Sequence, residues 1–86
     1  MPKIVRRKPL SLWEQHKARW SSCTACDLHL CRQKVVLGRG QVPCDLLICG
    51  EAPGNSEDTI GIPFVGPAGI LLDRMLEKSV PSHIEI

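Results

Sequence analysis

Aromatic residues are scarce in this sequence, which holds two tryptophans, one phenylalanine and no tyrosine among its 86 residues. A core built from this chain must therefore be mostly aliphatic. No apolar run approaches the roughly 20 residues that a membrane-spanning helix needs. The basic start of the chain also lacks the apolar stretch that completes a secretory signal peptide. The sequence thus predicts a protein with no membrane segment and no export signal.

A large charge of either sign is also absent, because the net charge is only +2 at pH 7. This value is too small to indicate nucleic-acid binding by itself. Basic residues do gather at the start of the chain, namely Lys3, Arg6, Arg7 and Lys8. Such a cluster is either a solvated, flexible lead-in or an arm that contacts phosphates. We predict a flexible basic lead-in over residues 1–10, with one domain over residues 11–86.

The five cysteines are odd in number and unevenly spaced, which argues against a disulfide framework. We expect reduced thiols in the cytoplasm, some of them metal ligands. Cys23 and Cys26 form a Cys-x-x-Cys pair, a spacing that suits zinc, an iron–sulfur cluster or redox exchange. A zinc site that adds Cys31 and Cys44, with His29 nearby, is one alternative. Two free thiols are the other.

The order of predicted elements indicates an α/β fold with a parallel sheet. Ser11 and Glu14 have the spacing of a capping box, which predicts a helix over residues 11–20. Pro67 is placed to begin a second helix, in which apolar residues recur at helical spacing. Apolar residues predict strands, which we place at residues 33–37 and 45–49, with a third beginning at 84–86.

A glycine-bracketed loop, GEAPG at residues 50–54, follows the most apolar predicted strand. In open α/β sheets, ligands bind outside the carboxyl ends of strands, so this loop predicts a pocket for a small ligand or a base. It is not a phosphate-binding P-loop, because Asn55 and Ser56 stand where that motif has lysine and serine or threonine. Within the strand, Cys49 is expected to be a small buried apolar residue.

Several stretches of this sequence occur together, in this order, in one known family. They are Cys23-Thr24-Ala25-Cys26 with Leu28 and Arg32, VVLGRG at 35–40, GEAPG at 50–54 with Glu57 and Asp58, GIPFVG at 61–66 and AGILL at 68–72. The latter part closely resembles the first active-site motif of the iron–sulfur uracil-DNA glycosylases. These are the family-four-type members of the uracil-DNA glycosylase superfamily. The resemblance covers roughly residues 12–78, which is most of the chain.

The resemblance implies a three-layer α/β/α domain with a parallel central sheet, of which this chain is the amino-terminal part. It also implies hydrolysis of the N-glycosidic bond of uracil in DNA, for base-excision repair. Cys23 and Cys26 would supply two of the four ligands of a [4Fe–4S] cluster. Two further cysteines and a histidine-bearing second motif would belong to a remainder absent from these residues, so we expect this chain alone to be inactive.

Within the pocket loops, the resemblance implies a role for each motif residue. Glu51 is the predicted catalytic carboxylate, which would place water and stabilise the sugar cation. Glu57 or Asp58 would share that task or only cap the following turn. Phe64 would stack on the flipped uracil. The other predicted substrate-binding residues are Gly50, Ala52, Pro53 and Gly54. The alternative function is a nonenzymatic metal- or DNA-binding module that retains the pocket motif.

Overall fold

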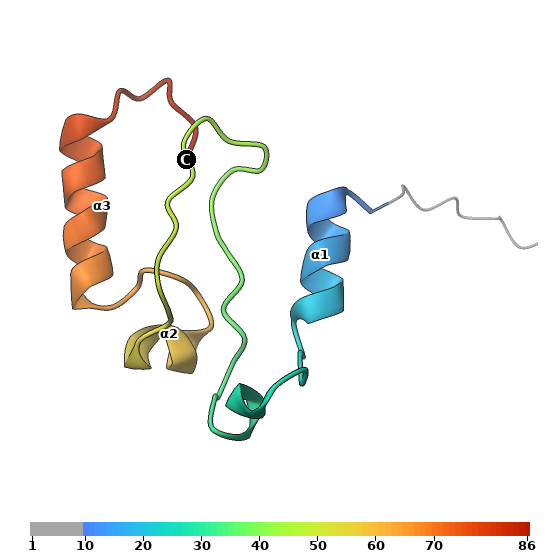
Figure 1. Ribbon diagram of the computed structural model, residues 1–86. Coiled ribbons are helices and arrows are strands. Elements are labelled where there is room, and N and C mark those ends of the chain that lie inside the picture. Colours follow the sequence, from blue (N-terminus) through green and yellow to red (C-terminus); the bar gives the residue numbers. More distant parts are fainter. Residues whose placement is uncertain (1–9) are drawn as a thin grey trace, which may run out of the picture.

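A computed structural model describes residues 10–86 (Figure 1). Its elements, in chain order, are α1 (Leu12–Trp20), a short 3-10 helix η1 (Asp27–Leu30), α2 (Asn55–Ile60) and α3 (Pro67–Ser79). The basic lead-in predicted over residues 1–10 lies outside the described residues except for Leu10. None of the helices between residues 10 and 86 has the length and apolar character of a membrane-spanning segment.

Helix α1 confirms the prediction for residues 11–20 and owes its start to local hydrogen bonds. The Glu14 amide donates to the Ser11 hydroxyl at 3.1 Å, and the Ser11 amide donates to the Glu14 carboxylate at 3.2 Å. These two bonds satisfy amides that the first turn of a helix leaves unpaired. Trp13 then contacts the middle of the chain, because a Cβ added at Gly38 would lie 2.9 Å from its ring.

Helix α3 confirms the second helix prediction. Pro67 occupies its first turn, where the missing amide proton costs nothing. Leu72 and Leu76 on one side of the helix line a groove, whereas Ile70, Leu71 and Met75 are exposed. The helix therefore presents apolar residues on more than one face.

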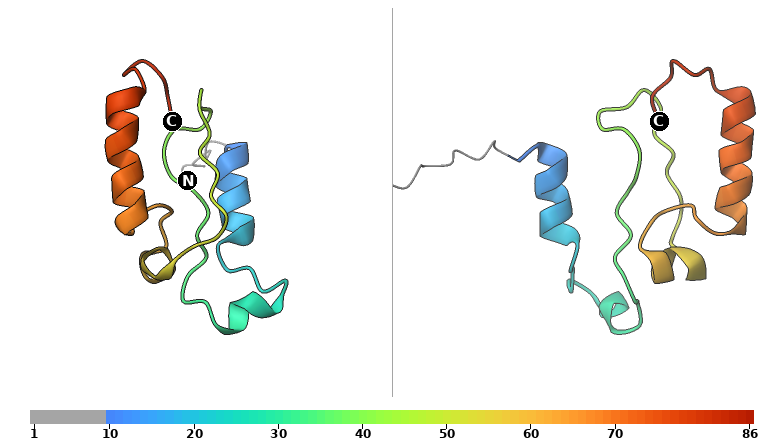
Figure 2. Two further views of the ribbon diagram at one scale, coloured as in Figure 1. Left: turned by 60° about the vertical axis from the view of Figure 1, so that its left-hand side comes forward. Right: turned by 180° about the vertical axis from the view of Figure 1, so that it is seen from behind.

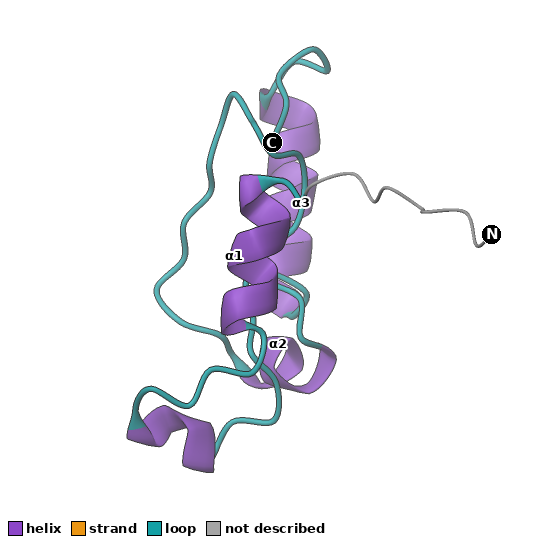
Figure 3. Ribbon diagram, turned by 90° about the vertical axis from the view of Figure 1, so that its right-hand side faces the viewer, coloured by secondary structure: helices purple, strands orange, loops and turns teal. Residues whose placement is uncertain are grey.

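The strand predictions for residues 33–37, 45–49 and 84–86 are wrong for this structure, because all three segments are loops (Figure 3). No strand occurs anywhere in residues 10–86, so the predicted parallel sheet is not present there. A strand exists only where its backbone groups pair with a neighbour. Residues 45–49 find such a neighbour at one end alone.

That pairing joins the start of the 45–49 segment to the end of the chain. The amides of Asp45 and Leu46 donate to the Glu85 carbonyl at 2.8 and 3.0 Å. The Glu85 amide donates to the Asp45 carboxylate at 2.9 Å, and the Gln41 amide donates to the Ile86 carbonyl at 2.9 Å. Residues 41–46 and 84–86 therefore lie side by side.

The helices nevertheless stand in layers around the extended segments. Helices α1 and α3 lie on opposite sides of the segments that run through residues 33–40 and 44–50 (Figures 1 and 2). No hydrophobic residue is fully buried in the described part of the chain. Leu47 is 78% exposed, and Cys49, predicted to be buried, is exposed as well. Alternate residues of the predicted strand therefore lie open to solvent, because no neighbouring strands cover that side.

Candidate functional site

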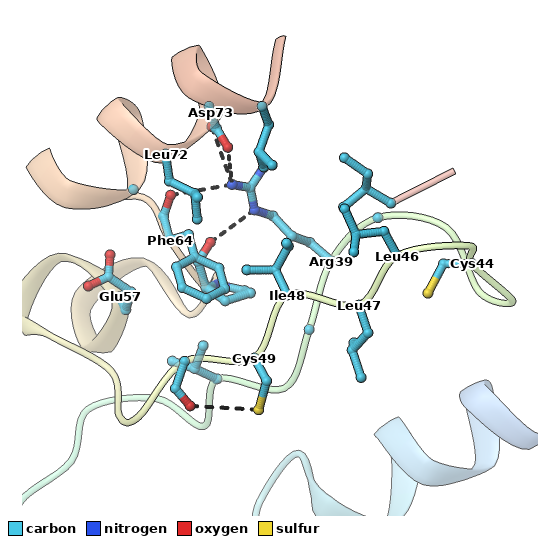
Figure 4. A pocket seen from close by; sticks show the side chains of 18 of the residues that line it. Arg39, Cys44, Leu46, Leu47, Ile48, Cys49, Glu57, Phe64, Leu72 and Asp73 are labelled. Carbon is cyan, nitrogen blue, oxygen red and sulfur yellow. Dashed lines mark hydrogen bonds and ion pairs between the residues drawn. The ribbon is translucent and has the colours of Figure 1, made fainter. Parts of the chain in front are cut away.

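An open groove of about 1580 Å³ lies between the extended segments and α3 (Figure 4). Its lining comes from residues 36–57 for the most part, from the loop before α3, from one side of α3 and from residues near the end of the chain. Leu46, Ile48 and Leu72 give it apolar walls. Polar groups enter from Arg39 and Asp73 (Figure 4).

Phe64 forms part of the groove wall and meets the glycine-bracketed loop there. A Cβ added at Gly50 would lie only 3.0 Å from the Phe64 ring, so glycine allows the ring to rest on the backbone. Phe64 itself has a φ of 57°. For a residue with a side chain, this left-handed conformation costs about 1–2 kcal/mol. The structure thus brings together two of the predicted substrate-binding residues, Gly50 and Phe64.

Glu57 ties the two loops of the groove together. Its carboxylate accepts hydrogen bonds from the amides of Gly54 at 3.1 Å, Val65 at 2.9 Å and Gly66 at 2.7 Å. The bond from Gly66 is the main cause that holds the pKa of Glu57 below its ordinary value. Desolvation, the next effect in size, raises the pKa, and the bonds from Val65 and Gly54 lower it further. The bond to the Gly54 amide is the capping bond that was one of the two roles predicted for Glu57. A share in the chemical step stays a prediction.

Helix α2, which carries Glu57, was missed by sequence reasoning, which treated residues 55–60 as loop. The available signal was Glu57 at the third position of the helix, where a capping glutamate stands. Asp58 next to it accepts hydrogen bonds from the amides of Gln33 at 2.7 Å and Lys34 at 3.3 Å. Asp58 therefore fastens α2 to the preceding extended segment.

Glu51, the predicted catalytic carboxylate, lines the groove with an exposed side chain. It makes no hydrogen bond within the described residues, in contrast to Glu57. Ala52, Pro53 and Gly54 continue the same exposed loop along the groove. The structure thus places Glu51 on the groove lining, next in the chain to Gly50, which meets the Phe64 ring. Its catalytic role stays a prediction.

Arg39 is the site residue that sequence reasoning did not identify. Its guanidinium donates to the Pro63 carbonyl at 2.9 Å, to the Phe64 carbonyl at 3.3 Å and to the Asp73 carboxylate at 3.0 Å (Figure 4). Asp73 is 34 residues away in sequence. No local pattern pairs residues at such a separation, so only the folded structure reveals this contact.

Cys23 and Cys26 lie in the loop between α1 and η1, with Cys23 half-buried and Cys26 exposed. The Arg32 side chain donates a hydrogen bond to the Cys23 carbonyl. Between residues 10 and 86, no three histidine, cysteine or acidic side chains come together as metal ligands. The two thiols therefore do not fit a four-ligand cluster by themselves. The alternative zinc set with Cys31 and Cys44 is not assembled either.

Comparison with known proteins identifies the family. Residues 37–85 match the family model described as the uracil DNA glycosylase superfamily. This match spans more than half of the chain, so the chain belongs to that superfamily, and membership implies the superfamily's fold. The resemblance found from the motifs is thereby confirmed.

Individual relatives show which enzymes of the superfamily this chain resembles. The chain is 47% identical over 68 residues to the type-4 uracil-DNA glycosylase of Thermotoga maritima, which is 79% of this chain and 35% of the relative. It is 47% identical to the type-4 enzyme of Pyrobaculum aerophilum (66% of this chain, 29% of the relative) and 49% identical to that of Archaeoglobus fulgidus (64% and 28%). The matched part thus spans about a third of the length of these relatives. No solved structure matches the chain.

Proposed function

We propose that residues 11–86 form the base-binding part of a uracil-DNA glycosylase, which hydrolyses the N-glycosidic bond of uracil in DNA during base-excision repair. The observation that carries this proposal is the contact of the Phe64 ring with Gly50 on the wall of an open groove. Membership of the superfamily and similarity to the type-4 enzymes support it.

The groove has the parts that capture of a flipped base requires. An enzyme that acts on a base in DNA must take it out of the stack and hold it against an aromatic or apolar surface. Phe64 offers such a ring, the backbone of Gly50 lies against it, and residues 51–54 continue along the same groove. A uracil stacked on Phe64 would therefore have its edge near the amides and carbonyls of that loop, where it would be recognised by hydrogen bonds.

Glu51 is the carboxylate that we assign to the chemical step. Breakage of the N-glycosidic bond leaves positive charge on the sugar and negative charge on the departing uracil. An exposed carboxylate at the rim of the groove would orient the attacking water and stabilise the sugar cation. Glu57 is less suited to this task, because three backbone amides already occupy its carboxylate.

In the complete domain, we assign residues 45–49 to a strand of the parallel sheet in a three-layer α/β/α fold. The layered order of α1, the extended segments and α3 supports this assignment (Figure 2). The hydrogen bonds between Asp45 and Glu85 support it too, since they already align two of the predicted strands. Further strands would cover Leu47, which this chain leaves exposed.

Cys23 and Cys26 are assigned as two of the four thiolate ligands of a [4Fe–4S] cluster, with the other two outside these residues. A bound cluster would cross-link the chain there and so stabilise the fold. The reaction at the groove uses neither thiol. The free state of all five cysteines supports a reducing compartment, and we therefore assign the protein to the cytoplasm.

A chimera tests the proposal. In it, this chain replaces the corresponding amino-terminal part of the Thermotoga maritima relative, and uracil release from a labelled oligonucleotide is measured under single-turnover conditions. We expect the chimera to release uracil and this chain alone to release little or none. Glu51→Gln should slow the chemical step by at least about a hundredfold, with DNA binding nearly intact. Phe64→Ala should weaken capture of uracil-containing DNA roughly tenfold to hundredfold.

The matched control is Glu85→Gln, which alters an exposed carboxylate outside the groove lining and should leave the rate unchanged. A chimera that melts cooperatively, carries iron and still leaves uracil untouched would contradict the proposal. If that chimera nevertheless bound DNA, the result would favour the nonenzymatic binding module. A rate for Glu51→Gln equal to that of the parent would refute the role of Glu51 alone.

A further inference from the structure

The geometry points to Arg39 as a positioning residue that fixes the Phe64 ring for base binding, an inference that rests on the proposed function. Arg39 donates from Nε to the Pro63 carbonyl at 2.9 Å and from Nη2 to the Phe64 carbonyl at 3.3 Å. The same Nη2 donates to Asp73 of α3 at 3.0 Å. One guanidinium thus connects the two carbonyl groups that flank the Cα of Phe64 to helix α3.

The backbone that carries Arg39 is itself held on both sides. A Cβ added at Gly38 would lie 2.9 Å from the Trp13 ring, and one added at Gly40 would lie 2.5 Å from the Ile86 carbonyl. Gly40 also has a φ of 95°, which favours glycine. The two glycines therefore let the chain on either side of Arg39 pack closely against distant segments. Because its backbone is held in this way, the Arg39 side chain can fix the position of the loop that carries Phe64.

Phe64 needs such a constraint because its backbone is in the left-handed region. A residue of this kind holds that conformation only where surrounding contacts determine it. The ion pair of Arg39 with Asp73 is 43% and 47% exposed at its two side chains, and exposed pairs add little to overall stability. The importance of Arg39 therefore lies in the two carbonyl groups that it holds, more than in the charge pair.

Replacing Arg39 by lysine distinguishes the effect of the two carbonyl contacts from that of the charge pair. Arg39→Lys keeps the positive charge opposite Asp73 but offers a single ammonium group, which cannot reproduce the fork of N–H groups. Asp73→Asn keeps Arg39 and an oxygen acceptor but removes the charge. Arg74→Lys is the matched control, since Arg74 is the next residue on α3 and makes no hydrogen bond or ion pair within the described part of the chain.

The measurement compares two DNA ligands bound by the chimera. The first carries a 2′-fluoro-2′-deoxyuridine, which resists cleavage, and the second carries an abasic-site analogue. Only the first presents a base to Phe64. We expect Arg39→Lys to bind the uracil ligand about tenfold more weakly, as for a lost stacking contact, with its affinity for the abasic ligand unchanged. Asp73→Asn should show a smaller loss with the same selectivity, and Arg74→Lys should match the parent.

In single turnover, the half-saturating enzyme concentration of Arg39→Lys should rise while the maximal rate changes little. Equal affinity of Arg39→Lys and the parent for the uracil ligand would overturn the inference. Equal weakening with both ligands would overturn it as well, because it would indicate a general structural or phosphate-binding role. If Arg39→Lys does not melt cooperatively, the affinities of Asp73→Asn for the uracil and abasic ligands test the inference instead. A parent chimera that does not prefer the uracil ligand would instead refute the proposed function.

Discussion

Replacing Gly69 by alanine should displace Phe64 from the groove wall. Gly69 lies in the first turn of α3 and is one of two buried residues, both glycines, between residues 10 and 86. A Cβ added there would lie 2.7 Å from the Cα of Phe64 and closer still to its carbonyl group. Carbon atoms in van der Waals contact stand about 3.5–4.0 Å apart, so the contact with the Cα alone would require the loop and the helix to separate by about 1 Å, and the closer contact with the carbonyl group requires more.

Two opposing effects decide the sign of the change. Alanine favours an unobstructed helix by about 1 kcal/mol over glycine, whereas overpacking at a close contact costs about 1–3 kcal/mol. We therefore expect the free energy of unfolding of the chimera to change little or to fall by up to about 2 kcal/mol. The effect on activity should be larger, because a displacement of about 1 Å can lower a rate about a hundredfold.

The assay pairs thermal unfolding with single-turnover release of uracil in the Gly69→Ala chimera. Arg74→Gly is the control, because Arg74 is an exposed position of α3 outside the groove lining. It should cost helix stability of about 1 kcal/mol and leave the rate nearly unchanged. A Gly69→Ala protein that is more stable than the parent and equally active would refute the close approach of α3 to Phe64.

Two further predictions concern the charges and thiols of the site. Hydrogen bonds from three backbone amides, of which that of Gly66 has the largest effect, hold the pKa of Glu57 below its ordinary value. The stability that these bonds add is therefore present above the ordinary pKa of about 4.3. It is lost as the pH falls through the lower pKa of the folded state. Melting curves at pH values between about 6 and 3 should show this loss, and Glu57→Gln should flatten it; an unchanged slope in that variant would assign the loss to other groups. Cys23→Ser or Cys26→Ser should deplete the chimera of iron and sulfide, whereas Cys49→Ser should not, and a full complement of iron in Cys23→Ser would rule out the assigned ligand.

The helices that the sequence predicted correctly are those with local signals. Ser11 and Glu14 lie three residues apart, and Pro67 acts at its own position, so α1 and the start of α3 follow from short-range chemistry. The prediction of a strand at residues 45–49 was wrong because a strand depends on partners elsewhere in the chain. Its apolar composition was visible, but the composition of one segment does not supply neighbours for it.

In the candidate site too, local features could be predicted from the sequence and long-range contacts could not. The glycine-bracketed loop and Phe64 were recognisable as motifs, and the structure places them in contact. The hydrogen bonds of Arg39 to two carbonyl groups were not recognisable, since they join residues 24 and 25 positions apart. No motif in the sequence indicated the left-handed backbone of Phe64 either. Glu57 lies between these cases, because its capping position was visible in the sequence whereas its bond to the start of α3 was not.

The hydrogen bonds between Asp45 and Glu85 also bear on how this chain folds. They join residues 40 positions apart, and closing a flexible loop of that length costs about 3 kcal/mol plus a constant. Contacts at such separation are slow to form because the chain must be ordered before they repay that entropy. We therefore expect α1 and α3 to form early and the Asp45–Glu85 contact late. The speed at which the groove is assembled is then set by the meeting of two distant segments, and faster helix formation would not change it.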